Sequence, residues 1–380
     1  MNIGLLGCGV VGGGVLALTQ DRSDIRVTRV LVRRPKEGLP EGAATCDVQD
    51  ILNDAAIDTV VEVMGGVHPA YEYVAAAMER GKHVVTANKA LIAAYYRELT
   101  ALAREKGVAL RYTAAVGGGI PWLVNLARCK RLDTVCAVGG IMNGTTNFIM
   151  DAMHKSPVDF PVILKEAQEL GYAEADPSAD IDGDDIRRKL CISANIAFDT
   201  VLDEETIPTF GIRTVTAADI AAFQAHGFVC KLLAAAERTD RGVCAYVEPT
   251  LVDCGEPEAA VPANYNLIGY VGEQVGRQSF FGQGAGRFPT ASNVVQDCLT
   301  ILAGDRAAYT DRVAPVALDL TAEAHPYYVR TGRPDAFLRS VAADTWGAGV
   351  VTGAVNTGEM LAWAKRQLSA DPACFIAGIR

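Results

Sequence analysis

The sequence predicts an α/β protein that starts with a doubly wound parallel sheet. Over roughly the first 130 residues, short apolar stretches typical of strands alternate with longer helical patterns. A glycine-rich segment follows the first of these strands. Strict alternation of strand and helix implies parallel strands joined by right-handed crossovers. A sheet of this type commonly binds a nucleotide.

The individual elements follow from local patterns. In the first region, strands are expected at 2–6, 26–32, 59–63 and 83–85, and helices at 11–20, 70–80 and 91–106. From about residue 139 the pattern changes, and a strand is expected to run into the polar turn 143–147 and then a helix at 148–154. Alternating and apolar runs at 244–252, 266–271 and 278–281 indicate a second sheet of antiparallel type, before a helix at 290–302.

Three parts of the chain are expected from these patterns. Residues 1–130 form a dinucleotide-binding domain that is completed by about 285–320, and residues 131–285 form a second, α+β domain. Residues 325–380 form a short α/β extension in the order strand, helix, strand, helix, strand. At about 55 residues, this extension is small for an independent domain.

The composition favours a small-molecule ligand over a nucleic acid or a membrane. The net charge is −10 and the pI is about 5.1, whereas nucleic acids and anionic membranes bind basic surfaces. No apolar run approaches the ~20 residues of a membrane span, and the strand pattern begins at Asn2, which leaves no room for a signal peptide. The ten cysteines are scattered without a CxxC pair, as expected of a reduced, cytoplasmic protein.

The glycine-rich segment Gly7-Cys8-Gly9-Val10-Val11-Gly12 stands where the first strand gives way to the first helix. Its first glycine permits a tight turn, the second lets the backbone approach a pyrophosphate, and the third packs helix on strand. This placement predicts a Rossmann-type dinucleotide site that includes Val10 and Val11; the alternative is a glycine-rich turn that binds nothing. Gly284, in the segment 282–286, belongs to a second glycine-rich helix start and is another candidate for the cofactor.

Arg33 and Arg34 follow the second expected strand, where an NAD-binding protein usually has an acidic residue that binds the ribose 2′-hydroxyl. Two guanidinium groups suit a 2′-phosphate instead. The sequence therefore favours NADP, with NAD as the other possibility. A pair of solvated surface arginines is the competing interpretation.

Glu174 lies on an expected turn, and Asp185 and Lys189 follow at i, i+4 spacing, which places both on one face of a helix. Two carboxylates and a lysine in such an arrangement can bind an amine and move a proton. The same pattern equally fits a solvated helix with an ordinary ion pair.

Several blocks of the sequence closely resemble the homoserine dehydrogenase family. They come in the family's order and cover about residues 3–305: 61–66, 81–91, 116–121, 143–148, 171–177 and 289–291. The resemblance implies NAD(P)-dependent interconversion of L-homoserine and L-aspartate 4-semialdehyde, in the pathway from aspartate to threonine and methionine. It also implies that the second domain is the catalytic, substrate-binding and dimerisation domain of a homodimer or higher homo-oligomer.

The resemblance also implies roles for single residues. Lys189 matches the family's proposed proton donor and acceptor, Lys89 matches a lysine near nicotinamide and substrate, and Glu174 and Asp185 match residues that bind homoserine. Met64, Gly65 and Gly171 match positions at the cofactor. A sodium site made of backbone carbonyls is implied at Thr113, Val116, Gly118 and Ile120, although the family commonly has Glu where this chain has Thr113.

Segments 327–330 and 332–338 resemble the start of an ACT regulatory domain. One strand of its usual βαββαβ order is missing or unrecognisable in the sequence, which puts threonine feedback in doubt. Two other functions remain open for the whole chain. One is a reductase of another amino-acid-derived carbonyl, and the other is a dinucleotide-binding sensor without catalysis. A panel of substrates would distinguish the first alternative, and nucleotide-dependent stabilisation without turnover would support the second.

Overall fold

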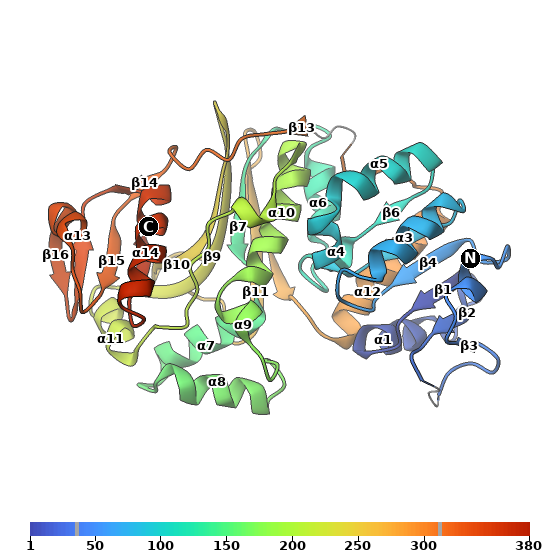
Figure 1. The fold of residues 1–380 in the computed structure, drawn as a ribbon, viewed down its shortest axis with the longest axis horizontal. Coiled ribbons are helices and arrows are strands. Elements are labelled where there is room, and N and C mark those ends of the chain that lie inside the picture. The colour runs from blue at the N-terminus through green and yellow to red at the C-terminus, as the bar shows by residue number, and fades with distance from the viewer. Residues whose placement is uncertain (35–37, 311–313) are drawn as a thin grey trace. The chain divides into compact units, whose positions relative to one another are not determined.

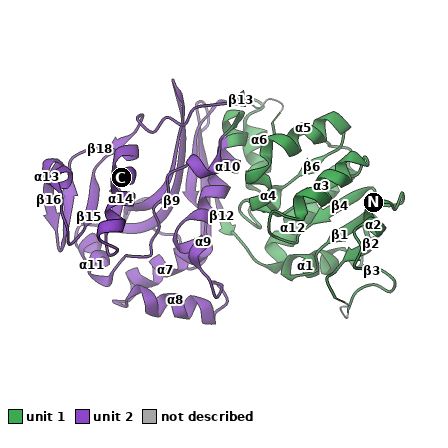
Figure 2. Ribbon diagram, viewed as in Figure 1, with its two compact units in different colours: residues 1–132, 195–201, 282–314 green, residues 133–194, 202–281, 315–380 purple. Residues whose placement is uncertain are grey.

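The structure is a computed structural model that describes residues 1–34, 38–310 and 314–380. It divides into two compact units (Figure 2). Unit 1 comprises Met1–Leu132, Asn195–Val201 and Gly282–Ala314, and unit 2 comprises Asp133–Ala194, Leu202–Phe281 and Pro315–Arg380. Within the stretch 285–320 expected to complete the first domain, 311–313 lie outside the described residues.

Unit 1 is built on a six-stranded parallel sheet in the order β3-β2-β1-β4-β5-β6. Its strands are β1 (Asn2–Leu6), β2 (Arg26–Leu31), β3 (Ala44–Thr45), β4 (Thr59–Glu62), β5 (His83–Thr86) and β6 (Leu110–Arg111). The order runs outward from β1 in both directions, which is the doubly wound arrangement (Figure 1). The predicted α/β fold class is confirmed.

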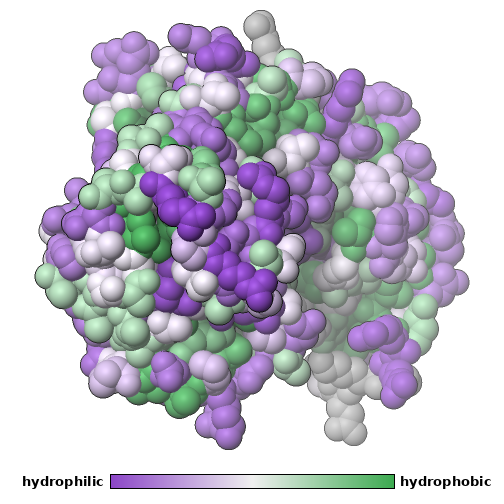
Figure 3. All heavy atoms as spheres, turned by 60° about the vertical axis from the view of Figure 1, so that its left-hand side comes forward, coloured by the Kyte–Doolittle hydropathy of each residue, from purple (hydrophilic) through white to green (hydrophobic). Residues whose placement is uncertain are grey.

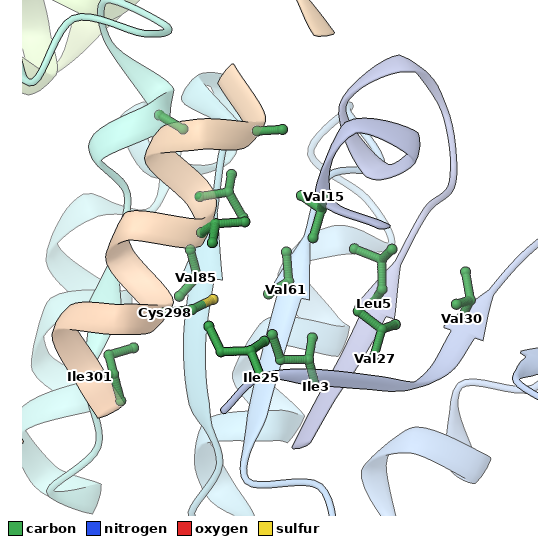
Figure 4. Close-up of a cluster of buried hydrophobic side chains, with 14 of the residues drawn as sticks. Ile3, Leu5, Val15, Ile25, Val27, Val30, Val61, Val85, Cys298 and Ile301 are labelled. Carbon is green, nitrogen blue, oxygen red and sulfur yellow. The ribbon is translucent and has the colours of Figure 1, made fainter. Parts of the chain in front are cut away.

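The helices of unit 1 are α1 (Val10–Thr19), α2 (Gln49–Leu52), α3 (Ala70–Glu79), α4 (Lys89–Ala94), α5 (Tyr96–Lys106), α6 (Trp122–Cys129) and α12 (Arg287–Leu302), with a 3-10 turn η1 (Thr113–Ala115). The single helix expected at 91–106 is two helices that meet at Tyr95. Figure 4 shows Cys298 and Ile301 of α12 beside strand residues such as Val61 and Val85. Helix α12, which comes late in the sequence, thus completes the hydrophobic core of unit 1.

Unit 2 contains a nine-stranded sheet in the order β12-β11-β7-β9-β10-β19-β15-β17-β16. Its first five strands are β7 (Val135–Ile141), β9 (Phe228–Thr239), β10 (Gly242–Asp253), β11 (Tyr265–Gly272) and β12 (Gly276–Gln283). The helices are α7 (Gly144–Lys155), α8 (Phe160–Glu169), α9 (Ser178–Ile181), α11 (Ala217–Ala225) and α10 (Asp184–Phe198), whose last residues belong to unit 1. A 3-10 turn, η2 (Glu204–Thr206), also lies in unit 2. Two short strand pairs lie outside the two large sheets: β8 (Thr200–Val201, in unit 1) with β13 (Ala314–Pro315), and β14 (Ala324–His325) with β18 (Val355–Asn356).

The C-terminal extension has the full βαββαβ order. It consists of β15 (Tyr327–Arg330), α13 (Ala336–Val341), β16 (Ala342–Trp346), β17 (Gly349–Thr352), α14 (Thr357–Ala370) and β19 (Phe375–Ile379). The strand that is missing or unrecognisable in the sequence pattern is therefore present in the fold. The overlooked strand is β16, a largely exposed edge strand without a hydrophobic alternation that would reveal it. The extension also shares the sheet of unit 2, because β19 pairs in parallel with β10.

Two further observations concern the surface. Among the described residues, no helix combines the length and apolar character needed to cross a membrane. On the face shown in Figure 3, hydrophilic side chains separate the hydrophobic residues into several groups.

Candidate active site

The glycine-rich loop of unit 1 has the geometry that a pyrophosphate needs. Gly7 has a φ of +98°, in a region that favours glycine, and a Cβ on Gly12 would lie 2.3 Å from the carbonyl oxygen of Gly7. Gly9 has no neighbour within 4 Å of its ideal Cβ position, and Val10 beside it is 69% exposed. The loop therefore presents open backbone at the N-terminus of α1, where N–H groups can bind phosphate oxygens.

The ends of β4 and β5 are tied together by the buried carboxylate of Glu62. This carboxylate accepts hydrogen bonds from the hydroxyl of Thr86 at 2.6 Å and from the backbone N–H of Met64 at 2.8 Å. Burial raises the pKa of Glu62, while these hydrogen bonds oppose the rise. The contacts fix the turn that begins at Met64 and continues through Gly65, whose φ is +78°.

Asn88 places Lys89 at the same edge of the sheet. Its side chain donates to the carbonyl oxygen of Gly66 at 2.6 Å and accepts from the N–H of Leu91, which caps α4. Lys89 is the first residue of that helix and is half-buried. Since the carboxyl ends of parallel strands share one edge, Lys89 lies at the edge that carries the glycine loop. Sequence reasoning missed Glu62 and Asn88 as positioning residues, although both fall in the family-like blocks.

Arg33 and Arg34 follow β2 at this edge and are both exposed. Gly284 lies beside the 116–121 segment, because a Cβ on Gly118 would approach the carbonyl carbon of Gly284 within 2.5 Å. The cofactor candidates of unit 1 thus follow β1, β2, β4 and, with Lys89, β5, and Gly284 adds the segment before α12.

In unit 2, the predicted Asp/Lys pair is buried. Lys189 Nζ lies 2.7 Å from Asp185 Oδ2 and donates to the carbonyl oxygen of Met142, also at 2.7 Å. Lys189 is 7% exposed and Asp185 is 5% exposed. The interpretation as a solvated surface ion pair therefore does not hold, and the ammonium is held at a defined position inside unit 2.

Asn143 joins this pair to a further carboxylate. Its amide nitrogen donates to Asp185 at 2.8 Å and to Asp180 at 2.7 Å. Burial, and then the nearby charge of Asp185, raise the pKa of Asp180, while Asn143 and Lys189 lower it. Sequence reasoning missed Asp180, because its link to the Asn-Gly-Thr-Thr-Asn block exists only in the folded chain.

Glu174 lies on the exposed turn after α8, where Gly171 has a φ of +75°. Thr145 donates to the carbonyl oxygen of Tyr172 at 2.6 Å, so the turn is attached to the start of α7. Asn143 in turn caps α7 by accepting from the N–H of Thr146. The structure thus joins Asp185 and Lys189 directly. The turn of Glu174 and the carboxylate of Asp185 are both connected to the start of α7, through Thr145 and Asn143 respectively.

At the expected carbonyl site in segment 113–120, two of the carbonyl oxygens accept hydrogen bonds from a side-chain amide. The carbonyl oxygens of Gly118 and Ile120 both accept from the amide nitrogen of Asn293, at 2.6 and 3.1 Å. A sodium ion bound by these two oxygens would have to share their lone pairs with this amide. Val116, in the same segment, is buried. The neutral hydroxyl of Thr113 donates to Asp297, whereas a glutamate at this position would add a negative charge. These residues do not fit a sodium ion held by this segment.

The two units together contain the groups that a dehydrogenase of an alcohol needs. Unit 1 has an open dinucleotide loop, and unit 2 has a buried ammonium with carboxylates beside it. Hydride transfer to an aldehyde generates an alkoxide, and an ammonium group can supply the proton.

Comparisons with known proteins agree with this arrangement. The family model for homoserine dehydrogenase matches residues 121–299, and the model described as homoserine dehydrogenase, NAD binding domain, matches residues 7–113. The homoserine dehydrogenase of Bacillus subtilis is 38% identical over 323 residues, which cover 82% of this chain and 75% of that relative. The corresponding protein of Synechocystis is 42% identical over 317 residues, covering 80% and 73%.

The solved structure of a homoserine dehydrogenase from Thiobacillus denitrificans matches with a TM-score of 0.89 and 33% identity, covering 100% of this chain and 98% of that chain. Sequence and structural similarity thus extend over both the NAD-binding Rossmann domain and the domain with the buried lysine. This chain belongs to the homoserine dehydrogenase family of oxidoreductases.

Proposed function

We propose that the protein interconverts L-homoserine and L-aspartate 4-semialdehyde, in the pathway from aspartate to threonine and methionine, with NADP as the preferred cofactor. The observation that carries the proposal is the buried Lys189, held between Asp185 and the carbonyl oxygen of Met142. A buried ammonium that is fixed by two partners can donate a proton to one point repeatedly without reorganising.

The residues of the chain have separate tasks in this reaction. When bound, the nicotinamide dinucleotide supplies the hydride-transfer chemistry. In the reductive direction, Lys189 donates a proton to the oxygen of the aldehyde and stabilises the negative charge that develops there. In the oxidative direction it accepts that proton. Asp185 orients the ammonium, and Asp185 and Glu174 bind the α-ammonium of the amino acid.

Lys89 is proposed to assist in proton transfer, since it stands at the sheet edge that carries the dinucleotide loop. Gly7, Gly9 and Gly12 and the N-terminus of α1 are proposed to bind the pyrophosphate, with Met64, Gly65, Gly171 and Gly284 as further contacts. Arg33 and Arg34 are proposed to bind the 2′-phosphate, since both are exposed at the end of β2. The family resemblance supports a homodimer or a higher homo-oligomer, which a measurement of molar mass by light scattering would test.

The test is a steady-state assay of NADPH oxidation with L-aspartate 4-semialdehyde. We expect turnover by the native protein and a loss of at least about 100-fold in kcat for Lys189→Ala, because proton transfer contributes roughly 10²–10⁴. Lys155→Ala is a matched control: Lys155 forms an i, i+4 pair with Asp151 at 2.7 Å, but its side chain is 64% exposed.

Two results would contradict the proposal. An undiminished rate in Lys189→Ala would remove the proton-transfer role of this lysine. No turnover by the native protein with this substrate, together with turnover of another amino-acid-derived carbonyl, would favour the alternative reductase.

A further inference from the structure

One pair of side chains on α12 holds the segment 113–120 of unit 1. Asn293 and Asp297 are four residues apart and therefore lie on one face of the helix. Asn293 donates to the carbonyl oxygens of Gly118 and Ile120, and Asp297 accepts from both the N–H and the hydroxyl of Thr113, at 2.9 and 2.6 Å. The helix thus supplies a donor at one end of the segment and an acceptor at the other.

The amide of Asn293 is well suited to two converging carbonyls. It has two N–H hydrogens, one for each oxygen, and Asn293 is only 6% exposed, so that water cannot easily replace it. Without Asn293, the buried carbonyl oxygen of Gly118 would lose this donor, which is costly, whereas that of Ile120 would keep the N–H of Trp122 at 2.8 Å. The hydrogens of the amide also carry partial positive charge toward the oxygens, and this charge would repel a cation at the same place.

Thr113, at the other end of the segment, also needs no cation beside it. Its hydroxyl bridges Asp297 and the hydroxyl of Tyr309, which lies 2.6 Å away. A glutamate, the residue that the family commonly has here, would bring a second carboxylate next to Asp297 and would need positive charge to balance it. Threonine needs no such positive charge, since its neutral hydroxyl donates a hydrogen bond to the carboxylate of Asp297.

We propose that Asn293 takes the place of the monovalent cation that the family resemblance implies. The amide donates where the cation would attract the carbonyl oxygens, and segment 113–120 keeps its conformation without sodium. The proposal concerns only the stability of unit 1, and it does not depend on the substrate or on the reaction proposed above.

Thermal unfolding of the full chain in NaCl, KCl and choline chloride at equal ionic strength tests the proposal without substrate or nucleotide. We expect the native protein to have the same Tm in all three salts and to leave the ²³Na NMR linewidth unchanged. Asn293→Ala is expected to lower the Tm by several degrees in choline chloride and to regain part of the loss in NaCl, because an ion can then approach the carbonyl oxygen of Gly118 and the remaining lone pair of Ile120.

Asn125→Ala is the matched control, since Asn125 also donates to a backbone carbonyl, that of Pro121 at 2.6 Å, but from a more exposed position. A sodium-specific rise in the Tm of the native protein would overturn the proposal. So would an Asn293→Ala variant that loses no more stability than Asn125→Ala, or one that is indifferent to sodium. Should Asn293→Ala fail to fold, Asn293→Ser allows the same comparison, and the salt series of the native protein decides independently.

Discussion

The buried pair of Asp185 and Lys189 makes a quantitative prediction about stability. Removing one partner of such a pair leaves the other charge buried without its counter-ion, which costs about 3–5 kcal/mol in proteins. Here each charge retains one other partner, because Lys189 still donates to Met142 and Asp185 still accepts from Asn143. We therefore expect about 3 kcal/mol, at the lower end of that range, for Asp185→Leu or for Lys189→Met.

The double variant separates charge burial from loss of packing. Replacing a whole buried ion pair by apolar residues of similar volume is often neutral, so Asp185→Leu with Lys189→Met should cost clearly less than the sum of the single changes. The assay is thermal unfolding of the two single variants and the double variant, with the Tm differences compared in one cycle. A loss of about 1 kcal/mol corresponds to roughly 2–4 °C for a domain of roughly 150–250 residues, a range that includes unit 2.

The exposed pair of Lys165 and Glu169 on α8 provides the control cycle, because it has the same i, i+4 spacing and its side chains are 77% and 68% exposed. An exposed helix pair of this kind contributes only about 0.3–0.5 kcal/mol. Strictly additive losses at Asp185 and Lys189, or single losses as small as those of the control pair, would refute the reasoning.

Three further predictions follow from other parts of unit 1. Arg33→Asp should lower kcat/KM for NADPH by about 10-fold or more, because each 1.4 kcal/mol of lost binding free energy weakens binding tenfold. The same change should leave kcat/KM for NADH nearly unchanged. An equal loss with both cofactors in steady-state assays would show that Arg33 does not bind the 2′-phosphate. Gly12→Ala should weaken nucleotide binding, measured by calorimetry, and cost about 1–3 kcal/mol of stability through overpacking, because its Cβ would lie 2.3 Å from the carbonyl oxygen of Gly7. Gly13→Ala, whose Cβ meets nothing nearer than Arg287 at 3.8 Å, should be tolerated, and equal effects of the two changes would contradict the steric argument. Burial raises the pKa of Asp297 from 3.8 to about 6, so the folded chain binds this proton more tightly than the unfolded chain does. Stability should therefore fall as the pH rises from about 4 to about 6, by up to roughly 3 kcal/mol. Asp297→Asn should remove this part of the pH dependence of the Tm, and an unchanged profile in the variant would exclude Asp297 as its source.

The sequence was sufficient to predict the fold class and most of the first sheet. Buried parallel strands such as β1 and β4 are short apolar runs, and the intervening helices show their own periodicity, so each element is marked by its own residues. The glycine loop was predictable for the same reason, since a strand, a tight turn and a helix follow one another directly. The strand β9 was overlooked because its centre, Ala234-Ala235-Ala236, has no β-branched residue.

What the sequence alone determined about this protein is therefore local: the strands and helices of the first region, the dinucleotide loop and the i, i+4 spacing of Asp185 and Lys189. That this pair is buried, and that Asn143 joins it to Asp180, was decided only by the tertiary structure. Asn143 and Asp185 are 42 residues apart, and Asn293 is 175 residues from Gly118. Contacts between residues so far apart in the chain depend on how the helices pack on the sheets, and a local sequence pattern cannot predict them.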